Sequence, residues 1–323
     1  MNPLAITPAD ILRFALDAPA GDAVLVTLVG IAGSSPRALG AQMVVRSNGD
    51  YRGSFSGGCI EAAIVGEARS ILATGESRIV RFGAGSPYID IRLPCGGGID
   101  LLFTPRPDPR VIAATLARLD AREPAAISIS GAGITAARST ATCGWSGDSF
   151  LRPFVPSLRI VAMGHGDALV ATARLAHFFG ADVRAVSPAS ADVAELAAAG
   201  IAAMPIDHRA PPPLPGDRWT AFILLFHDHE WEEVLLPWAL RQPHLHVGAI
   251  GGAQSRRDRL RMLRGKGFDE STLEHFRTPA GLIPATRDPA TLALSVIAQI
   301  VAAYQAEGPG AQKRATEAVS LYD

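Results

Sequence analysis

Residues 158–187 read LRIVAMGHGDALVATARLAHFFGADVRAVS, and this segment decides the fold of the C-terminal half of the chain. Residues 158–162 are apolar apart from Arg159 and predict a buried strand, and the glycines and polar residues at 164–167 predict a turn. A helix is predicted over 168–179, ended by Gly180, and a second strand over 182–186. A strand, a helix and a strand in succession indicate a βαβ unit with parallel strands.

The same alternation continues beyond this segment. Helices are predicted at 191–199, 230–240 and 255–263, and strands at 201–204, 221–226 and 246–250. Working back toward the N-terminus, Thr7 and the proline after it predict a helix start. A strand follows at 23–29, and Asn48-Gly49, with positive φ at both residues, predicts a hairpin between 42–46 and 51–55. The predicted fold class is α/β: an N-terminal α/β domain with a mixed sheet, then a C-terminal Rossmann-like doubly wound parallel sheet.

The C-terminal turn carries an incomplete dinucleotide fingerprint. G-x-G-x-x-G is expected between strand and helix, but residues 162–167 read AMGHGD. Ser187 stands where an acid would hold the ribose. A second glycine turn ending at Gly251-Gly252 precedes Arg256-Arg257, and its backbone N–H groups with the arginines suit a phosphate. NAD(P) binding is therefore kept only as an alternative.

Two H-x-H pairs, at 227–229 and 244–246, fall on or beside predicted strands. Alternate residues of a strand share a face, so each pair could clamp a metal ion. His227 falls at the C-terminal end of a predicted strand, where such sheets build their sites. We therefore expect a polar role at the strand end rather than a metal site.

Two of the three cysteines stand in glycine-rich settings. Cys59 follows Ser56-Gly57-Gly58, and Cys95 precedes Gly96-Gly97-Gly98. Apolar periodicity from Ile60 onward predicts a helix with Cys59 in its first turn, where the helix dipole lowers a thiol pKa. Small residues and a guanidinium at Gly33-Ser34-Ser35-Pro36-Arg37 suit a phosphate or carboxylate, although a plain turn is the alternative. Cys143 has no such setting and is expected to be structural.

Composition excludes several classes of protein. The chain has 323 residues, 48% of them hydrophobic, and a formal charge of -1, so it lacks the basic excess that nucleic-acid or membrane surfaces attract. An odd count of three cysteines indicates reduced thiols rather than a disulfide scaffold. The N-terminus shows no signal peptide, and the apolar run at 292–304 is too short for a bilayer span. We expect a cytoplasmic protein that binds neither nucleic acid nor membrane.

The chain resembles the XdhC/CoxI family, the xanthine dehydrogenase accessory factors. The N-terminal resemblance rests on the segments GSSPR at 33–37, SGGC at 56–59 with Glu61, and CGG at 95–97. The C-terminal resemblance rests on Gly164, Asp167, His227-Asp228, Gly248, Gly251 and the segment PAGL at 279–282. It covers nearly the whole chain, apart from residues 122–150 and the tail after Tyr304.

The resemblance implies a protein that handles the molybdenum cofactor, a pterin with a metal-binding dithiolene and a phosphate. Such proteins hold the cofactor, present it for sulfuration and deliver it to a molybdenum hydroxylase. The implied partners are an apo molybdenum hydroxylase of the xanthine dehydrogenase type and a cysteine desulfurase, and we expect a homodimer that is an accessory factor rather than an enzyme. The candidate cofactor-binding residues are Cys59, Cys95, Ser34, Ser35, Arg37, Ser56, Gly57, Gly58, Glu61, Gly96, Gly97, Gly164, His165, Asp167, His227 and Gly251.

The predicted domains are a cofactor-handling domain at 1–110, a connecting helix, hairpin and linker at 111–155, a Rossmann-like domain at 156–305 and a tail at 306–323. Two other functions stay open at this point. One is an NAD(P)-dependent oxidoreductase that uses the C-terminal sheet. The other is a sulfurtransferase with a persulfide on Cys59.

Overall fold

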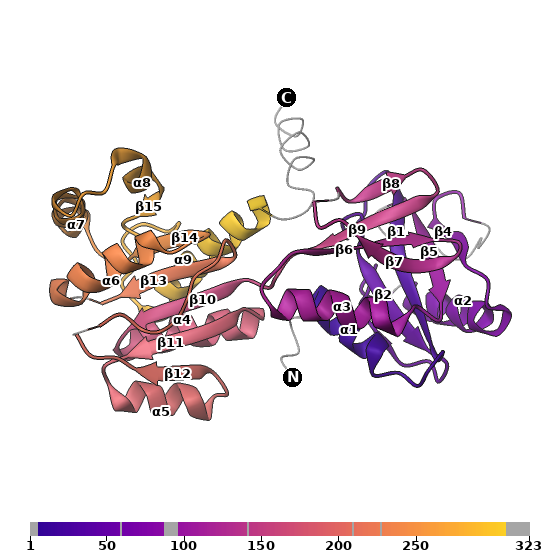
Figure 1. Cartoon of the computed structure of the whole chain (residues 1–323), viewed down its shortest axis with the longest axis horizontal. Helices are drawn as coiled ribbons and strands as arrows, with labels where there is room; N and C mark the ends of the chain where they lie inside the picture. The colour runs from indigo at the N-terminus through magenta and orange to yellow at the C-terminus, as the bar shows by residue number, and fades with distance from the viewer. Residues whose placement is uncertain are drawn as a thin grey trace. The chain divides into compact units, whose positions relative to one another are not determined.

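The computed structural model describes residues 6–58, 60–86, 96–140, 142–208, 210–226 and 228–307. These residues form two compact units (Figure 1), the N-terminal unit, Ile6–Pro156, and the C-terminal unit, residues 157–307. The α/β fold class predicted from the sequence is confirmed, with antiparallel sheets in the N-terminal unit and a parallel sheet in the C-terminal unit.

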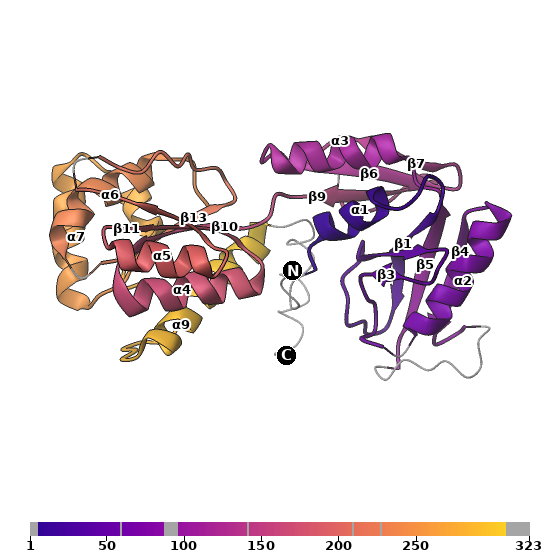
Figure 2. The same cartoon turned by 90° about the horizontal axis from the view of Figure 1, so that it is seen from below.

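A five-stranded sheet with the order β3-β2-β1-β5-β4 is the centre of the N-terminal unit. Its strands are β1 (Ala23–Ala32), β2 (Gln42–Arg46), β3 (Tyr51–Arg52), β4 (Arg78–Gly83) and β5 (Gly98–Pro105), and all described pairs are antiparallel. Helix α2 (Glu61–Thr74) covers one face, while α1 (Pro8–Leu16) and α3 (Pro109–Asp120) lie over the other (Figure 2).

Strand β1 is apolar from Ala23 to Val29 apart from Thr27, because both of its faces are buried there. Val24, Val26 and Leu28 pack on the α2 side, whereas Leu25 and Val29 pack on the side of α1 and α3. Side chains alternate across a strand, so a strand between two apolar layers has no polar face. Strand β1 has ten residues and ends at Ala32, directly before the predicted site segment at 33–37.

A second, four-stranded sheet packs on the α1 and α3 side, with the order β7-β6-β9-β8. Its strands are β6 (Ala125–Ser130), β7 (Gly133–Ala137), β8 (Gly144–Ser146) and β9 (Ser149–Phe154). The linker predicted at the end of 111–155 is wrong over most of its length, because β9 pairs with β6 as far as Phe154. On its other edge, β9 pairs with β8 only as far as Leu151. The N–H that Pro153 lacks therefore breaks no hydrogen bond to β8.

The C-terminal unit is a six-stranded parallel sheet with the order β12-β11-β10-β13-β14-β15. Its strands are β10 (Arg159–Gly164), β11 (Asp182–Ser187), β12 (Ala202–Pro205), β13 (Thr220–Leu225), β14 (His246–Ala249) and β15 (Phe276–Arg277). The chain winds outward from β10 in one direction and from β13 in the other. The boundary between these two strands is the switch point where doubly wound sheets form ligand crevices.

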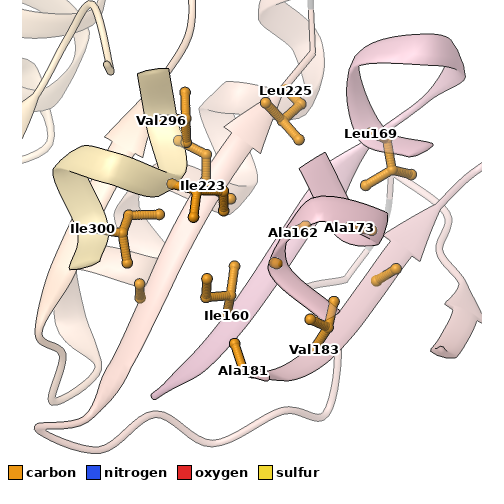
Figure 3. Close-up of a cluster of buried hydrophobic side chains, with 14 of the residues drawn as sticks. Ile160, Ala162, Leu169, Ala173, Ala181, Val183, Ile223, Leu225, Val296 and Ile300 are labelled. Atoms are coloured by element: carbon orange, nitrogen blue, oxygen red, sulfur yellow. The ribbon is translucent and has the colours of Figure 1, made fainter. Parts of the chain in front are cut away.

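Helices cover both faces of this sheet (Figure 2). On one face lie α4 (Gly166–Phe179), α5 (Ser190–Ala198) and α9 (Pro289–Glu307), and on the other α6 (His229–Arg241), α7 (Ala253–Gly265) and α8 (Glu270–His275). Figure 3 shows the first layer, where Ile160 and Ile223 of the sheet meet Ala173 of α4 and Ile300 of α9. All six residues of β13 are buried, as expected for a central parallel strand.

Helix α9 is the one described helix that is long and apolar enough to cross a membrane by length and composition. It has 19 residues and extends beyond the apolar run at 292–304 at both ends, so the expectation that this segment is too short for a bilayer span does not hold for the whole helix. Val296 and Ile300 pack in the core of the C-terminal unit, and a core helix passes the same length and composition test. Our expectation that the protein does not bind a membrane stays a prediction.

Most predicted elements are present, and two local details differ. At the hairpin only Gly49 has a positive φ, of 90°, whereas a positive φ was also expected at Asn48. Gly49 N–H donates to the Arg46 carbonyl oxygen at 2.9 Å, which closes a type I turn followed by a left-handed residue. Asn48 instead accepts a side-chain bond from Asp50 N–H at 2.9 Å. Helix α8 and the two-residue strand β15 have too little periodicity to be predicted.

Candidate functional site

Three of the predicted site segments meet at one end of the five-stranded sheet. Strand β1 ends at Ala32, which pairs with Gly98 at the start of β5, so the segment after β1 adjoins the segment before β5. A Cβ atom on Gly97 would lie 2.1 Å from the Ser34 carbonyl oxygen, so only glycine fits there. Arg37 Nε donates a hydrogen bond to the Ser54 carbonyl oxygen at 2.8 Å. This bond joins the segment at 54–58 to the segment at 33–37. We call residues 33–37, 54–58 and 96–97 together the glycine-loop site.

Glu61, the first residue of α2, organises the central loop of this site. Its side chain is 3% exposed and accepts hydrogen bonds at both oxygens. Oε1 accepts from Ser54 Oγ (2.9 Å), Phe55 N (2.9 Å) and Ser56 N (2.8 Å), and Oε2 from Ser56 Oγ (2.7 Å), Gly58 N (2.8 Å) and Ile60 N (3.3 Å). The loop is therefore wrapped around an internal anion.

These bonds keep Glu61 ionised. Burial alone raises the pKa of a carboxyl, but the bonds from Ser56, Phe55 and Ser54 outweigh burial and lower the pKa of Glu61 to about 2. Because its carboxylate is committed to its own loop, we assign Glu61 a positioning role. Direct contact between Glu61 and a ligand stays a prediction.

The outer surface of the loop is open. Gly57 and Gly58 have φ values of 76° and 126°, and a Cβ atom on either would meet no heavy atom of the described residues within 4 Å. Gly96 is likewise exposed, with a φ of 70° and no such neighbour in the described part of the chain. Glycines at these positions satisfy backbone geometry and leave room for a ligand to approach the main chain.

Arg37 gives the site a positive charge. Ser35 Oγ donates to the Arg37 carbonyl at 2.9 Å and accepts from Arg37 N–H at 3.3 Å, which fixes the turn that carries the arginine. Arg37 is exposed, and no ion pair joins it to a carboxylate within the described part of the chain. With Nε held by Ser54, the two terminal nitrogens are the donors that could meet an anionic group.

Cys59 and Cys95 lie outside the described residues, so their predicted meeting in one pocket stays a prediction. The helix that was expected to include Cys59 in its first turn begins at Glu61. The third cysteine, Cys143, is half-buried and its Sγ contacts the Leu39 carbonyl at 3.5 Å. Cys143 thus packs inside the N-terminal unit, consistent with a structural role.

The remaining candidate residues lie in the C-terminal unit, most of them at the switch point. A Cβ atom on Gly164 would lie 2.7 Å from Leu225 Cβ, so this glycine allows β10 and β13 to pack closely. His165 precedes α4, with its ring 5.8 Å from that of Phe226 and its Nε2 4.0 Å from Asp228 Oδ2. Asp167 is exposed in the first turn of α4, and His227 lies outside the described residues.

Gly251 serves a packing role. Its φ is 145°, and a Cβ atom there would lie 3.0 Å from an Arg259 terminal nitrogen. Arg259 is 3% exposed and forms a buried ion pair with Glu232, with a further bond to Thr278 Oγ1 at 3.0 Å. The second glycine turn is therefore shaped around a buried arginine, and any contact of Gly251 with a phosphate stays a prediction.

Metal binding gains no support from the described residues, among which no three His, Cys, Asp or Glu side chains form a group that could hold a metal ion. His246 is 5% exposed, and burial, with the charges of Arg277 and His244, lowers its pKa to about 4. His244 Nδ1 instead meets the Gln242 carbonyl at 2.8 Å. The metal clamp that this pair could form in principle gains no support from these contacts.

Sequence reasoning missed the residues that act through distant contacts. Ser54 anchors both Arg37 and Glu61. Asp192 reaches the turn before α4 from a different helix. Each is an ordinary polar residue in the sequence, and its role depends on where the fold places it.

Comparison with known proteins agrees with this arrangement. The model of the XdhC and CoxI family matches residues 18–83, and the model of the XdhC Rossmann domain matches residues 160–300. The chain therefore belongs to the XdhC/CoxI family, and the predicted resemblance is confirmed. It is 37% identical over 296 residues to the molybdenum cofactor insertion chaperone PaoD of Escherichia coli, covering 90% of this chain and 86% of that protein.

A solved structure from Bacillus halodurans, described as a xanthine dehydrogenase, shares the fold with a TM-score of 0.75. The likeness covers 95% of this chain and 99% of the other at 18% identity. At that identity the comparison concerns the fold alone.

Proposed function

We propose that this protein is a maturation chaperone that binds the molybdenum cofactor and delivers it to a molybdenum hydroxylase of the xanthine dehydrogenase type. Its family, and its identity to a relative named as a molybdenum cofactor insertion chaperone, support this proposal. The observation that carries it is the convergence of three glycine-rich segments, joined through Gly97, Arg37 and Glu61, around an open surface.

The donor chemistry of these segments fits the cargo. A molybdenum dithiolene centre is soft and suits thiolate neighbours, which Cys59 and Cys95 would supply from the two glycine-rich stretches of sequence in which they occur. Its phosphate suits the exposed guanidinium of Arg37 beside Ser34 and Ser35. The carboxylate of Glu61 fills the inner side of the loop, so the ligand would meet the outer glycine surface.

Several finer features belong to the proposal. We infer that the protein acts in the cytoplasm as a homodimer, presents the cofactor for sulfuration with a cysteine desulfurase as partner, and passes it to the apo-hydroxylase. Gel filtration with light scattering tests the dimer. Co-purification with a tagged desulfurase tests that partner.

Cofactor retention tests the proposal. The protein is purified from cells that make molybdenum cofactor, and its pterin and molybdenum are assayed. We expect both in the wild-type protein and in Cys143→Ala, and neither above background in the folded double variant Cys59→Ala/Cys95→Ala. Stoichiometric cofactor in that double variant would remove the two cysteines from the account.

A further inference from the structure

The turn before α4 is occupied by a carboxylate of the protein itself. Asp192 lies in the first turn of α5 and is 9% exposed. Its Oδ2 accepts from Gly166 N–H at 2.9 Å and from Ser187 Oγ at 2.7 Å. Ser187 Oγ in turn accepts from Ala189 N–H at 3.1 Å, so the serine holds the start of α5 beside the turn.

This position matters because of what other doubly wound folds do with it. Their dinucleotides place the pyrophosphate at the N-terminus of the first helix, where unpaired N–H groups and the helix dipole attract an anion. Their acid at the end of the second strand reaches outward to the ribose. Here Ser187 ends the second strand, and the acid five residues later turns inward to the N–H of Gly166.

The charges around this turn also disfavour the binding of an anion. Asp167 is exposed in the first turn of the same helix. The ring of His165 already faces a carboxylate, with Nε2 4.0 Å from Asp228 Oδ2. None of the described bonds of Gly166, Ser187 or Asp192 involves an arginine or lysine that could offset a second anion. A phosphate at this turn could not use the Gly166 N–H, which already donates to Asp192, and nearby carboxylates would repel it.

We propose that Asp192 is a specificity-determining residue that closes the glycine turn of the C-terminal unit to phosphate, so that this unit does not bind nicotinamide dinucleotides there. Asp192 takes the place that the pyrophosphate would otherwise take. This inference concerns a different unit from the glycine-loop site and does not depend on the chaperone function. It argues against the NAD(P)-dependent oxidoreductase considered from the sequence.

Ligand titration of the full chain tests this inference. NADH and inorganic pyrophosphate are titrated at matched ionic strength into the wild-type protein, Asp192→Ala, Asp192→Asn and Glu195→Ala. Glu195 is the matched control, an acid on the same helix whose carboxylate pairs with Arg174 at 3.1 Å. Circular dichroism and gel filtration establish that each variant is folded.

We expect no saturable binding by the wild-type protein or Glu195→Ala up to about 1 mM, the upper end of ordinary substrate affinities. Asp192→Ala should bind both probes at least about tenfold more tightly than the wild type. Saturable micromolar NADH binding by the wild type would overturn the inference. So would a folded Asp192→Ala that gains no binding. If Asp192→Ala does not fold, the same gain in binding is measured in Asp192→Asn, which keeps an oxygen acceptor and removes the charge.

Discussion

Arg37 Nε donates a 2.8 Å hydrogen bond to the carbonyl oxygen of Ser54, joining two loops that lie 17 residues apart in the chain. Ser54 also donates through its hydroxyl to Glu61 Oε1 at 2.9 Å. One serine therefore couples the exposed cation of the glycine-loop site to its buried anion. Changes at Arg37 and Glu61 should have separable effects, because only Glu61 is buried.

Replacing Arg37 should weaken cofactor binding with little change in stability. Arg37→Ala removes a charge-assisted contact, worth about 1.5–3 kcal/mol when made to an ion, so cofactor retention should fall about tenfold or more. Arg37→Lys keeps the charge without the planar fork and should recover only part of the loss. Retention is measured as bound pterin, with Arg138→Ala as an exposed arginine control in the same unit. Unchanged retention in Arg37→Ala would exclude Arg37 from the site.

Glu61→Gln should destabilise the N-terminal unit. A drop of the carboxyl pKa from 4.5 to about 2 corresponds to about 3 kcal/mol at neutral pH, and the amide also turns its NH2 group toward backbone donors. Denaturant unfolding measures the loss, and the exposed Glu123→Gln is the control, with an expected change within about 0.5 kcal/mol. Equal stability of the two variants would contradict the role assigned to Glu61.

The contribution of Glu61 should vanish in acid. Its folded-state pKa lies below the unfolded value, so its stabilisation is complete above about pH 4.5 and is lost as pH falls through about 2. The difference in unfolding free energy between the wild type and Glu61→Gln should therefore narrow from pH 5 toward pH 2. A constant difference across this range would mean that the bonds to Glu61 are not those of a carboxylate.

His246 should give the C-terminal unit a separate acid sensitivity. Burial lowers the pKa of His246 from 6.5 to about 4, so the unfolded chain takes up the proton at a higher pH than the folded chain does. The free energy of unfolding therefore decreases as the pH falls from 6.5 to about 4, by about 3 kcal/mol in total. His246→Leu removes this titration and the buried Nε2, which has no hydrogen-bond partner among the described residues. The melting temperature of this variant should change less between pH 7 and pH 4 than that of the wild type, whereas exposed His275→Leu should leave the profile unchanged.

Gly97→Ala should separate two of the site segments. The new Cβ would lie 2.1 Å from the Ser34 carbonyl oxygen, so one loop must move. We expect a loss of about 1–3 kcal/mol, as for overpacking elsewhere, together with reduced cofactor retention. Gly66→Ala is the matched control, because it lies within α2 with open space and should stabilise the protein by about 0.4–1 kcal/mol. A neutral Gly97→Ala would show that the two segments are not held together.

The sequence contained enough local information to predict most elements. The βαβ periodicity after Leu158 predicted the parallel sheet, and Thr7 with Asp10 forms the capping box of α1, with bonds of 2.9 and 3.2 Å. These features depend on residues close together in the chain. Strand β9 was misread because Pro153 is typical of a linker, and only its position beyond the end of β8 makes it acceptable in a strand.

The candidate site was predictable only in part, since its segments carry recognisable glycine and serine patterns but its connections do not. Nothing in the sequence near Arg37 indicates Ser54 as its partner, and Glu61 looks like any acid at a helix start. Asp192 is a similar case, because its inward bond to Gly166 depends on the packing of α5 beside α4. Long-range hydrogen bonds of this kind become visible only in the folded chain.

Transfer of the cofactor tests the central claim most directly. Purified protein loaded with molybdenum cofactor is mixed with a cofactor-free molybdenum hydroxylase of the xanthine dehydrogenase type, and hydroxylase activity is followed with the molybdenum content of both proteins. The account predicts that activity appears while molybdenum leaves this protein in matching amount, and that Cys59→Ala/Cys95→Ala transfers none. Full reactivation by that double variant, or loaded wild-type protein that never reactivates the hydroxylase, would contradict it.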